Sequence, residues 1–179
     1  MAWGLFLWAN IARRMAAWPA YWHLHLCAAA LGFAQMQQKG TGMDIFKAGG
    51  RPSKLAAAEY FTGTVWQTPI VEAPAPARVR ALKVAFAPGA RTAWHTHPLG
   101  QTLYVTDGVG LVGWGDAPVQ RIAAGDTVWI PPGCLHWHGA APDSPMTHIA
   151  IQEALDGQVA DWGAHVSDAE YLGAAVTEA

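Results

Sequence analysis

Two pairs of histidines with the same spacing mark the residues of this chain that could do chemistry. His95 and His97 are separated by one residue, and so are His136 and His138. Residues two apart on a β-strand project to the same side, so each pair would present both imidazoles to one face. Imidazole suits manganese, iron, cobalt, nickel, copper and zinc alike. One such pair is weak evidence for a metal, but two pairs in β structure indicate a metal site.

A glutamine and a fifth histidine belong to the same pattern. Gln101 follows His97 by four residues, at a place where a carboxylate would be the more usual partner of a metal. In a later candidate strand, His148 shares one face with Ala150 and Gln152. If the sheets close on one another, these side chains converge with the two histidine pairs on one cavity.

The segments that must position these side chains form a series of short candidate strands. Glycine and proline recur every several residues from Met43 onward, between short apolar or alternating runs. Regular spacing of this kind predicts an all-β sandwich or barrel. The candidate strands are Tyr60–Trp66, Val79–Phe86, Gln101–Thr106, Gly110–Trp114, Val119–Ile122, Thr127–Ile130, His136–Ala140 and Met146–Gln152.

Local signals refine this series of strands. A turn is expected at Asp107-Gly108, between two of the candidate strands. Near the C-terminus, the run from Ser167 to Glu170 forms a capping box and predicts a short helix. No helix-turn-helix segment is present, which argues against a transcription regulator.

The composition bounds the class of protein. The 179 residues are 52% hydrophobic and 13% charged, which excludes a disordered chain. Residues 43–179 hold 8 basic and 13 acidic side chains, so this part is mildly acidic and has no basic stripe. We therefore expect no nucleic-acid partner. Cys27 and Cys134 do not make a disulfide framework, which fits a reducing compartment without requiring one.

The N-terminal residues 1–42 differ from the rest of the chain. They carry Arg13 and Arg14 ahead of an apolar run, Met15–Ala34, that is about long enough to span a bilayer. A folded element is one interpretation, and two others remain open. The segment is a signal or anchor, which places the protein in the periplasm or on a membrane, or translation starts at Met43 and the protein is cytoplasmic. Residues 43–179 form the predicted domain in either case.

Two stretches of the sequence resemble the two cupin motifs. "GARTAWHTHPLGQTLYVTDG" has the first motif's spacing, from Gly89 through the histidine pair and Gln101 to Gly108. "GDTVWIPPGCLHWHGA" has the second, from Gly125 to His136 and beyond. Gln101 departs from the usual glutamate, and Ala140 from a frequent asparagine. The resemblance implies a cupin double-stranded β-helix, a jelly-roll barrel, followed by the short helix.

A closer resemblance is to small bacterial cupins with hydroxynitrile lyase activity. It rests on Trp94–Leu103, on "HWHGAAPDSPMTH" and on "IQEALDGQVADWGAHV". It implies cleavage or formation of (R)-cyanohydrins such as mandelonitrile, with an aldehyde and HCN as the other partners. It further implies a site metal, usually Mn²⁺, otherwise Fe²⁺ or another divalent transition ion. The ligands that the resemblance implies are His95, His97, Gln101 and His136, with His138 and His148 as groups that face the substrate.

The chemistry of these residue types agrees with that implied activity. Three imidazoles and an amide oxygen are all neutral ligands, so a divalent ion keeps its full charge for Lewis-acid work. A histidine with a pKa near neutral can remove the cyanohydrin proton. We expect His138 or His148 to act as this base and the other to assist cyanide, and the sequence does not order the two. The candidate wall residues of the pocket are Leu82, Val84, Phe86, Trp114, Trp129, Ile149 and Gln152.

Two other functions compete with the lyase. The first is a metal-dependent dioxygenase acting on a phenolic or alkene substrate, against which the neutral Gln101 argues. The second is a non-catalytic cupin that binds a small molecule, against which the complete ligand set and the two extra histidines argue. We also expect a homodimer or homotetramer, with the strand Tyr60–Trp66 as a segment that could pair across subunits.

Overall fold

Antiparallel strands dominate the fold, as the regular punctuation of the sequence predicts. A computed structural model describes residues 42–172. One short α-helix follows the last strand, so the prediction of an all-β domain with a C-terminal helix is confirmed. In chain order the elements are β1 (Lys54–Leu55), β2 (Phe61–Thr62), β3 (Val65–Glu72), β4 (Val79–Phe86), β5 (Arg91–Thr96), β6 (Gln101–Trp114), β7 (Gln120–Ala123), β8 (Thr127–Ile130), β9 (His136–Ala140), β10 (Met146–Glu153), β11 (Asp161–His165) and α3 (Asp168–Leu172).

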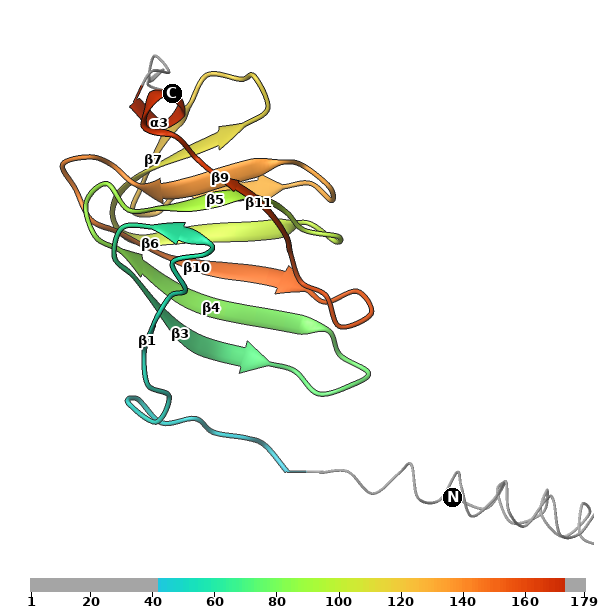
Figure 1. The fold of residues 1–179 in the computed structure, drawn as a ribbon. Coiled ribbons are helices and arrows are strands. Elements are labelled where there is room, and N and C mark those ends of the chain that lie inside the picture. The colour runs from blue at the N-terminus through green and yellow to red at the C-terminus, as the bar shows by residue number, and fades with distance from the viewer. Residues whose placement is uncertain (1–41, 173–179) are drawn as a thin grey trace, which may run out of the picture. The chain divides into compact units, whose positions relative to one another are not determined.

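The strands form one curled sheet with two halves. Its order is β1-β3-β4-β10-β6-β9-β5-β11, with β2 on β5 and both β7 and β8 on β6. Figure 1 shows β3, β4 and β10 side by side, with β5, β9 and β11 beyond β6. The first part of β6 pairs with β8 and β10, and its second part pairs with β7 and β9. Strand β6 therefore connects the two halves around the interior.

The prediction of a turn at Asp107-Gly108 is wrong, because strand β6 continues through these two residues. Gly108 has a φ of 73°, and the register with β10 shifts opposite it, between Thr147 and His148. A Cβ at Gly108 would overlap the carbonyl oxygen of Pro145, so only glycine fits here. The sequence signal marks a β-bulge that bends a long strand.

The other departures from the predicted strands have local causes. The candidate strand Tyr60–Trp66 is split into β2 and β3 by Gly63, whose φ is 80°. Strands β5 and β11 were not among the candidates, although β5 carries His95 and is followed directly by His97. β2 pairs with β5, and β1 pairs with β3 through Leu55 and Trp66. The segment that was expected to pair across subunits thus already has partners within its own chain.

The main hydrophobic core lies inside the curled sheet. Phe86, Leu103, Val105 and Met146 are among its fully buried members. Val84 and Phe86 are buried while Lys83 between them is exposed, as the alternation of side chains along β4 requires.

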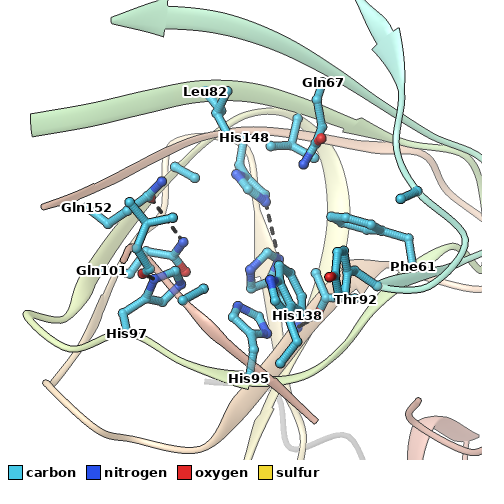
Figure 2. Close-up of a pocket in the computed structure, with 17 residues that line it drawn as sticks. Phe61, Gln67, Leu82, Thr92, His95, His97, Gln101, His138, His148 and Gln152 are labelled. Atoms are coloured by element: carbon cyan, nitrogen blue, oxygen red, sulfur yellow. Dashed lines mark hydrogen bonds between the residues drawn. The ribbon is translucent and has the colours of Figure 1, made fainter. Parts of the chain in front are cut away.

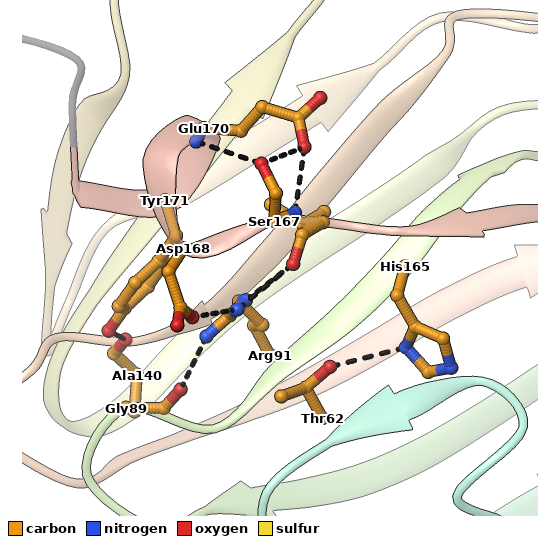
Figure 3. A network of polar contacts seen from close by, with 10 residues as sticks. Thr62, Gly89, Arg91, Ala140, His165, Ser167, Asp168, Glu170 and Tyr171 are labelled. Atoms are coloured by element: carbon orange, nitrogen blue, oxygen red, sulfur yellow. Dashed lines mark hydrogen bonds and ion pairs between the residues drawn. The ribbon is translucent and has the colours of Figure 1, made fainter.

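The C-terminal helix docks on the outside of the sheet. Ser167 donates its backbone N–H to Glu170 Oε2 at 2.7 Å, and Glu170 returns its own N–H to Ser167 Oγ at 3.2 Å. This is the predicted capping box (Figure 3). Tyr171 donates its hydroxyl to the Ala140 carbonyl at 2.6 Å, and buried Arg91 pairs with Asp168 at 2.6 Å. The helix is therefore joined to β5 and β9.

Within residues 42–172, no helix has the length and apolar character needed to cross a membrane. The signal, anchor or false start expected at residues 1–42 falls almost wholly outside the described residues. The boundary at Met43 and the cellular location stay predictions.

Candidate metal centre

The four strands β5, β6, β9 and β10 bring the predicted site residues together. His95 on β5 lies opposite His136 on β9, and Gln101 on β6 lies opposite Gln152 on β10. The imidazole centroids of His95 and His136 are 4.1 Å apart, and those of His95 and His97 are 5.1 Å apart. His95, Gln101 and Gln152 leave their strands on the inner face, and His97 follows β5 directly, so residues far apart in sequence meet at one place (Figure 2).

Three histidines are held in the same manner by backbone carbonyl groups. His95 Nδ1 donates to Ala93 O at 3.0 Å, His97 Nδ1 to Val159 O at 2.6 Å, and His136 Nδ1 to Cys134 O at 2.9 Å. A carbonyl oxygen only accepts, so each Nδ1 carries the hydrogen and each neutral ring keeps a bare Nε2. The Nε2 atoms of His97 and His136 are buried without a partner. This arrangement fixes the tautomer and ring orientation that a metal ligand needs.

The side chain of Gln101 is held in a comparable way. Its Nε2 donates to Gln152 Oε1 at 3.2 Å, while its own Oε1 is buried with no hydrogen-bond partner. A buried carbonyl oxygen without a donor is costly unless it meets a cation or a ligand. The free Oε1 and the bare imidazole nitrogens therefore make a donor set that fits a divalent transition ion.

A further histidine pair lies beside this donor set. His148 Nε2 and His138 Nδ1 are 3.3 Å apart and share one hydrogen bond. The opposite nitrogens, His138 Nε2 and His148 Nδ1, are buried and have no partner. Phe86 packs against both rings, with centroid distances of 5.9 and 5.4 Å. Phe86 thus covers the His138–His148 pair on the side that faces the hydrophobic core.

Proximity alone selects a slightly different trio of histidines. One possible ligand atom from each of His95, His136 and His138 lies within 4.8 Å of the others, so three buried histidines could hold a metal. However, His138 is engaged by another imidazole, which does not fix its tautomer as a carbonyl oxygen does. His97 has the fixed tautomer and the orphaned Nε2. We therefore favour His97 as the third imidazole ligand and place His138 next to it.

All five histidines of the centre are neutral at ordinary pH. Burial is the first cause in each case, and it lowers the pKa of His97, brings the pKa of His136 to about 4 and that of His148 to about 3. Burial, followed by the repulsion that a second protonated histidine beside it would exert, lowers the pKa of His95 and of His138 well below the ordinary value. Neutral imidazole is the form that binds a metal or accepts a proton.

Comparison with known proteins agrees with this geometry. Residues 82–152 match the model of the cupin domain family. The chain is 54% identical to an (R)-mandelonitrile lyase from Granulicella tundricola over 129 residues, which are 72% of this chain and 98% of that protein. The chain belongs to the cupin family. A crystal structure of a cupin-like protein from Thermotoga maritima is 39% identical with a TM-score of 0.66, covering 74% of this chain and 97% of that one.

A more distant structural likeness supports the cupin fold alone. It is to the polyketide cyclase RemF from Streptomyces resistomycificus, with 14% identity and a TM-score of 0.59, over 73% of this chain and 91% of that one. At this identity the likeness carries no argument about activity.

The cupin cavity has a volume of about 360 Å³ and is lined by both polar and apolar groups. This size suits a small organic molecule. Leu82, Val84 and Gln152 are among its lining residues, together with His138 and His148. Figure 2 shows Leu82 and His148 on one side of the cavity and His95 and His97 on the other. Phe86 lies behind the histidine pair rather than on the cavity surface.

Besides Phe86, three of the wall residues expected from the sequence lie outside the cavity lining. Trp129 is 61% exposed and pairs with Thr102, on the outer face of the sheet. Ile149 falls between two inward-facing residues of β10 and so points outward. Trp114, at the end of β6, is 40% exposed and lines a separate surface pocket. Residue type suggested an apolar wall, but strand alternation decided the face.

The cupin cavity also contains residues that the sequence did not single out. They are Ala57, Tyr60, Phe61, Gln67, Thr92, Val159, Ala160 and Trp162. Gln67 lies on the inner face of β3 opposite Val84, a place that alternation could have predicted. Trp162 and its neighbours come from the C-terminal segment, where no alternating pattern was present to indicate a strand.

Proposed function

We propose that this cupin is a metal-dependent hydroxynitrile lyase that cleaves or forms (R)-cyanohydrins such as mandelonitrile. The identity of 54% to an (R)-mandelonitrile lyase supports the reaction class. The observation that carries the proposal is the hydrogen-bonded pair His138–His148, which lines the same cavity as three of the proposed metal ligands. Such a site offers a proton acceptor, a proton donor and a cation position within one small space.

The proposed metal ligands are His95, His97, Gln101 and His136, and the proposed ion is Mn²⁺ or Fe²⁺. All four ligands are neutral, so none of them reduces the positive charge of the ion. When bound, a divalent ion supplies a Lewis acid that polarises the oxygen of the substrate. The rest of the reaction belongs to the chain's own residues.

The two outer nitrogens of the pair, His138 Nε2 and His148 Nδ1, necessarily differ in protonation. Each neutral imidazole carries one hydrogen, and one hydrogen lies between His148 Nε2 and His138 Nδ1. If His148 donates this bond, His148 Nδ1 is bare and His138 Nε2 is protonated. If His138 donates it, the two outer nitrogens exchange roles. In either state the pair has one outer nitrogen that accepts a proton and one that donates.

This pair can both take up and supply the protons that the proposed reaction transfers. The bare outer nitrogen takes the hydroxyl proton of the cyanohydrin, and the carbon–cyanide bond breaks as the aldehyde C=O forms. The electron pair of the broken bond leaves with cyanide, and the protonated outer nitrogen delivers a proton to give HCN. The pair ends as the other neutral tautomer with its proton count unchanged. Synthesis of the cyanohydrin is the same sequence in reverse.

The apolar part of the cavity suits the aldehyde end of such a substrate. Leu82, Val84 and Phe61 contribute aliphatic and aromatic surface beside the polar groups. We propose that the aryl group of mandelonitrile rests on this side while its hydroxyl group faces the histidines.

The deciding experiment is aldehyde release from racemic mandelonitrile by the manganese-loaded full chain. It is run at mildly acidic pH, beside metal-stripped protein and the His136→Ala variant. The proposal expects fast release by the loaded wild type alone, with consumption of the (R)-enantiomer. Release at the rate of both controls, with metal bound, would exclude the lyase. Oxygen uptake with phenolic or alkene substrates would then test the dioxygenase alternative.

A further inference from the structure

Two of the proposed metal ligands are contacted by a segment that lies after the matched cupin domain. The family match ends at residue 152, whereas Val159 and Trp162 follow it by several residues. Val159 accepts the Nδ1–H of His97 through its carbonyl oxygen at 2.6 Å. Trp162, on β11, lies directly opposite His95 in the register of β11 with β5. The C-terminal segment therefore supports the centre from outside the matched domain.

The ring of Trp162 stacks on the ring of His95. Their centroids are 4.6 Å apart and their planes are inclined by 27°. The hydrogen bond from His95 to Ala93 fixes the tautomer of the imidazole, but one bond to a neighbouring carbonyl leaves the plane of the ring free to tilt. A flat aromatic neighbour at this distance restrains that tilt.

Trp162 is itself held by two other aromatic rings. It stacks on Tyr60 with centroids 4.8 Å apart at 23°, and it contacts Phe61 at 5.7 Å. Phe61 belongs to β2, which pairs with the same strand β5 that carries His95. Trp162 is thus positioned by contacts to a part of the chain about a hundred residues earlier.

Packing of the hydrophobic core does not account for Trp162. Every residue of β11 is exposed, and Trp162 retains 36% of its surface. It belongs to neither of the two core clusters of the described residues. Its ring contacts are with the proposed ligand His95 and with Tyr60 and Phe61, which line the cavity where it meets the edge of the core.

We propose that Trp162 is a positioning residue for the metal ligand His95, so that β11 is a working part of the metal centre. This inference depends on the metal site within the proposed function and does not depend on the cyanohydrin reaction. His95 is common to both candidate ligand sets, so the inference holds for either of them. Loss of the aromatic ring at position 162 should leave the His95 ring free to tilt. It should therefore weaken metal binding without unfolding the chain.

The test compares Trp162→Phe with Trp162→Leu in the full chain. Both substitutions are apolar and comparable in size, but only phenylalanine can stack on an imidazole. Each protein is stripped of metal and titrated with Mn²⁺ against a competing chelator, which gives the Kd and the rate of metal release. Trp129→Leu is the matched control, since Trp129 is an exposed tryptophan on the outer face, away from the cavity, and leucine keeps that face apolar.

The expected result is a Kd raised by roughly 10- to 100-fold and faster release in Trp162→Leu, as for other residues that orient metal ligands. Trp162→Phe should stay close to the wild type, as should Trp129→Leu, and the metal-free melting temperatures of all four proteins should agree closely. A wild-type Kd in Trp162→Leu would overturn the inference, and so would equal weakening in Trp162→Phe. The inference would also be overturned if Trp162→Leu had a lower metal-free melting temperature that accounted for its weaker Mn²⁺ binding.

The test of Trp162 can be decided separately from the test of the proposed lyase activity. If the wild type binds Mn²⁺ but does not cleave mandelonitrile, the lyase fails while the comparison of Kd values still decides the role of Trp162. If the wild type binds no Mn²⁺, Fe²⁺ or other divalent transition ion, both proposals are overturned together.

Discussion

The amide nitrogen of Gln101 donates to the side-chain oxygen of Gln152 at 3.2 Å, across the paired strands β6 and β10. This bond decides which end of the Gln101 amide is free. With Nε2 occupied, Oε1 is the atom left without a partner. An amide nitrogen has no lone pair to offer a cation, so this orientation is the one that permits metal binding.

Removing the hydrogen-bond acceptor on Gln152 should therefore weaken metal binding. We expect Gln152→Leu to raise the Kd for Mn²⁺ by roughly tenfold, the low end of the range for residues that orient a ligand. Gln152→Glu keeps an oxygen in reach of Gln101 Nε2 and should bind at least as well as the wild type. Calorimetric titration of metal-stripped protein measures both. Equal affinity in Gln152→Leu and the wild type would contradict this role.

The neutrality of Gln101 should matter more for the reaction than for metal affinity. Gln101→Glu supplies a charged oxygen, so we expect tighter metal binding. The carboxylate also cancels half the charge of a divalent ion and should lower kcat for mandelonitrile on the order of tenfold or more. Gln67→Glu is the matched control, because it adds the same charge to the cavity from β3, outside the ligand set. An equal loss of kcat in both variants would assign the effect to cavity charge alone.

Alanine variants separate ligands from proton-transfer groups. His97→Ala should lose metal, whereas His138→Ala and His148→Ala should keep it and lose activity by about 10²- to 10⁴-fold, the usual range for general acid–base groups. For each variant, the metal content after gel filtration is measured by atomic emission and compared with kcat. Loss of metal from His138→Ala with retention in His97→Ala would instead select the trio identified by proximity.

Strand alternation carried most of what the sequence could predict about the site. Side chains at every second position of a strand share a face, so the sequence alone could assign His148 and Gln152 to one cavity. The same rule, applied to Ile149, would have excluded it from the wall. The aromatic character of Trp129 gave no such information, because tryptophan occurs on both faces of a sheet.

The contribution of the C-terminal segment could not be predicted in the same way. The residues of β11, from Asp161 to His165, are all exposed and show no alternation. They form a strand because β5 offers hydrogen-bonding partners to them, and these partners are distant in sequence. The capping box of α3 was predictable because all its groups lie within four residues.

The outer face of the β3–β4–β10–β6–β8 part of the sheet motivates a prediction about assembly. Exposed Trp66, Tyr104, Trp129 and Ile151 lie on it, and strand register places them on one side. Large exposed apolar faces commonly mark interfaces between subunits. We propose a homodimer or homotetramer that uses this face. Light scattering should give a multiple of 19.1 kDa for the wild type and a smaller mass for the double variant Tyr104→Glu/Trp129→Glu. A monomeric wild type would refute it.

The Glu170 carboxylate should make the stability of the chain depend on acid pH. Hydrogen bonds from the Ser167 hydroxyl and backbone N–H lower the pKa of Glu170, with a smaller contribution from Trp94 Nε1–H, which donates at 3.2 Å. A carboxyl whose pKa is lower in the folded chain binds fewer protons there than in the unfolded chain. It therefore stabilises the fold above its ordinary pKa, and this stabilisation is lost as the pH falls through the lowered value.

Glu170→Gln removes that charge and measures its effect. At pH 7 the variant should melt below the wild type, because the cap of α3 loses its ionised acceptor. The difference should shrink from about pH 4 downward, as the wild-type carboxyl becomes protonated. Melting temperatures from pH 7 to pH 3 test this, with Glu59→Gln as a control at an exposed position whose substitution should leave the profile unchanged. A difference that stays constant over the whole range would show that the carboxylate charge is not what stabilises the helix.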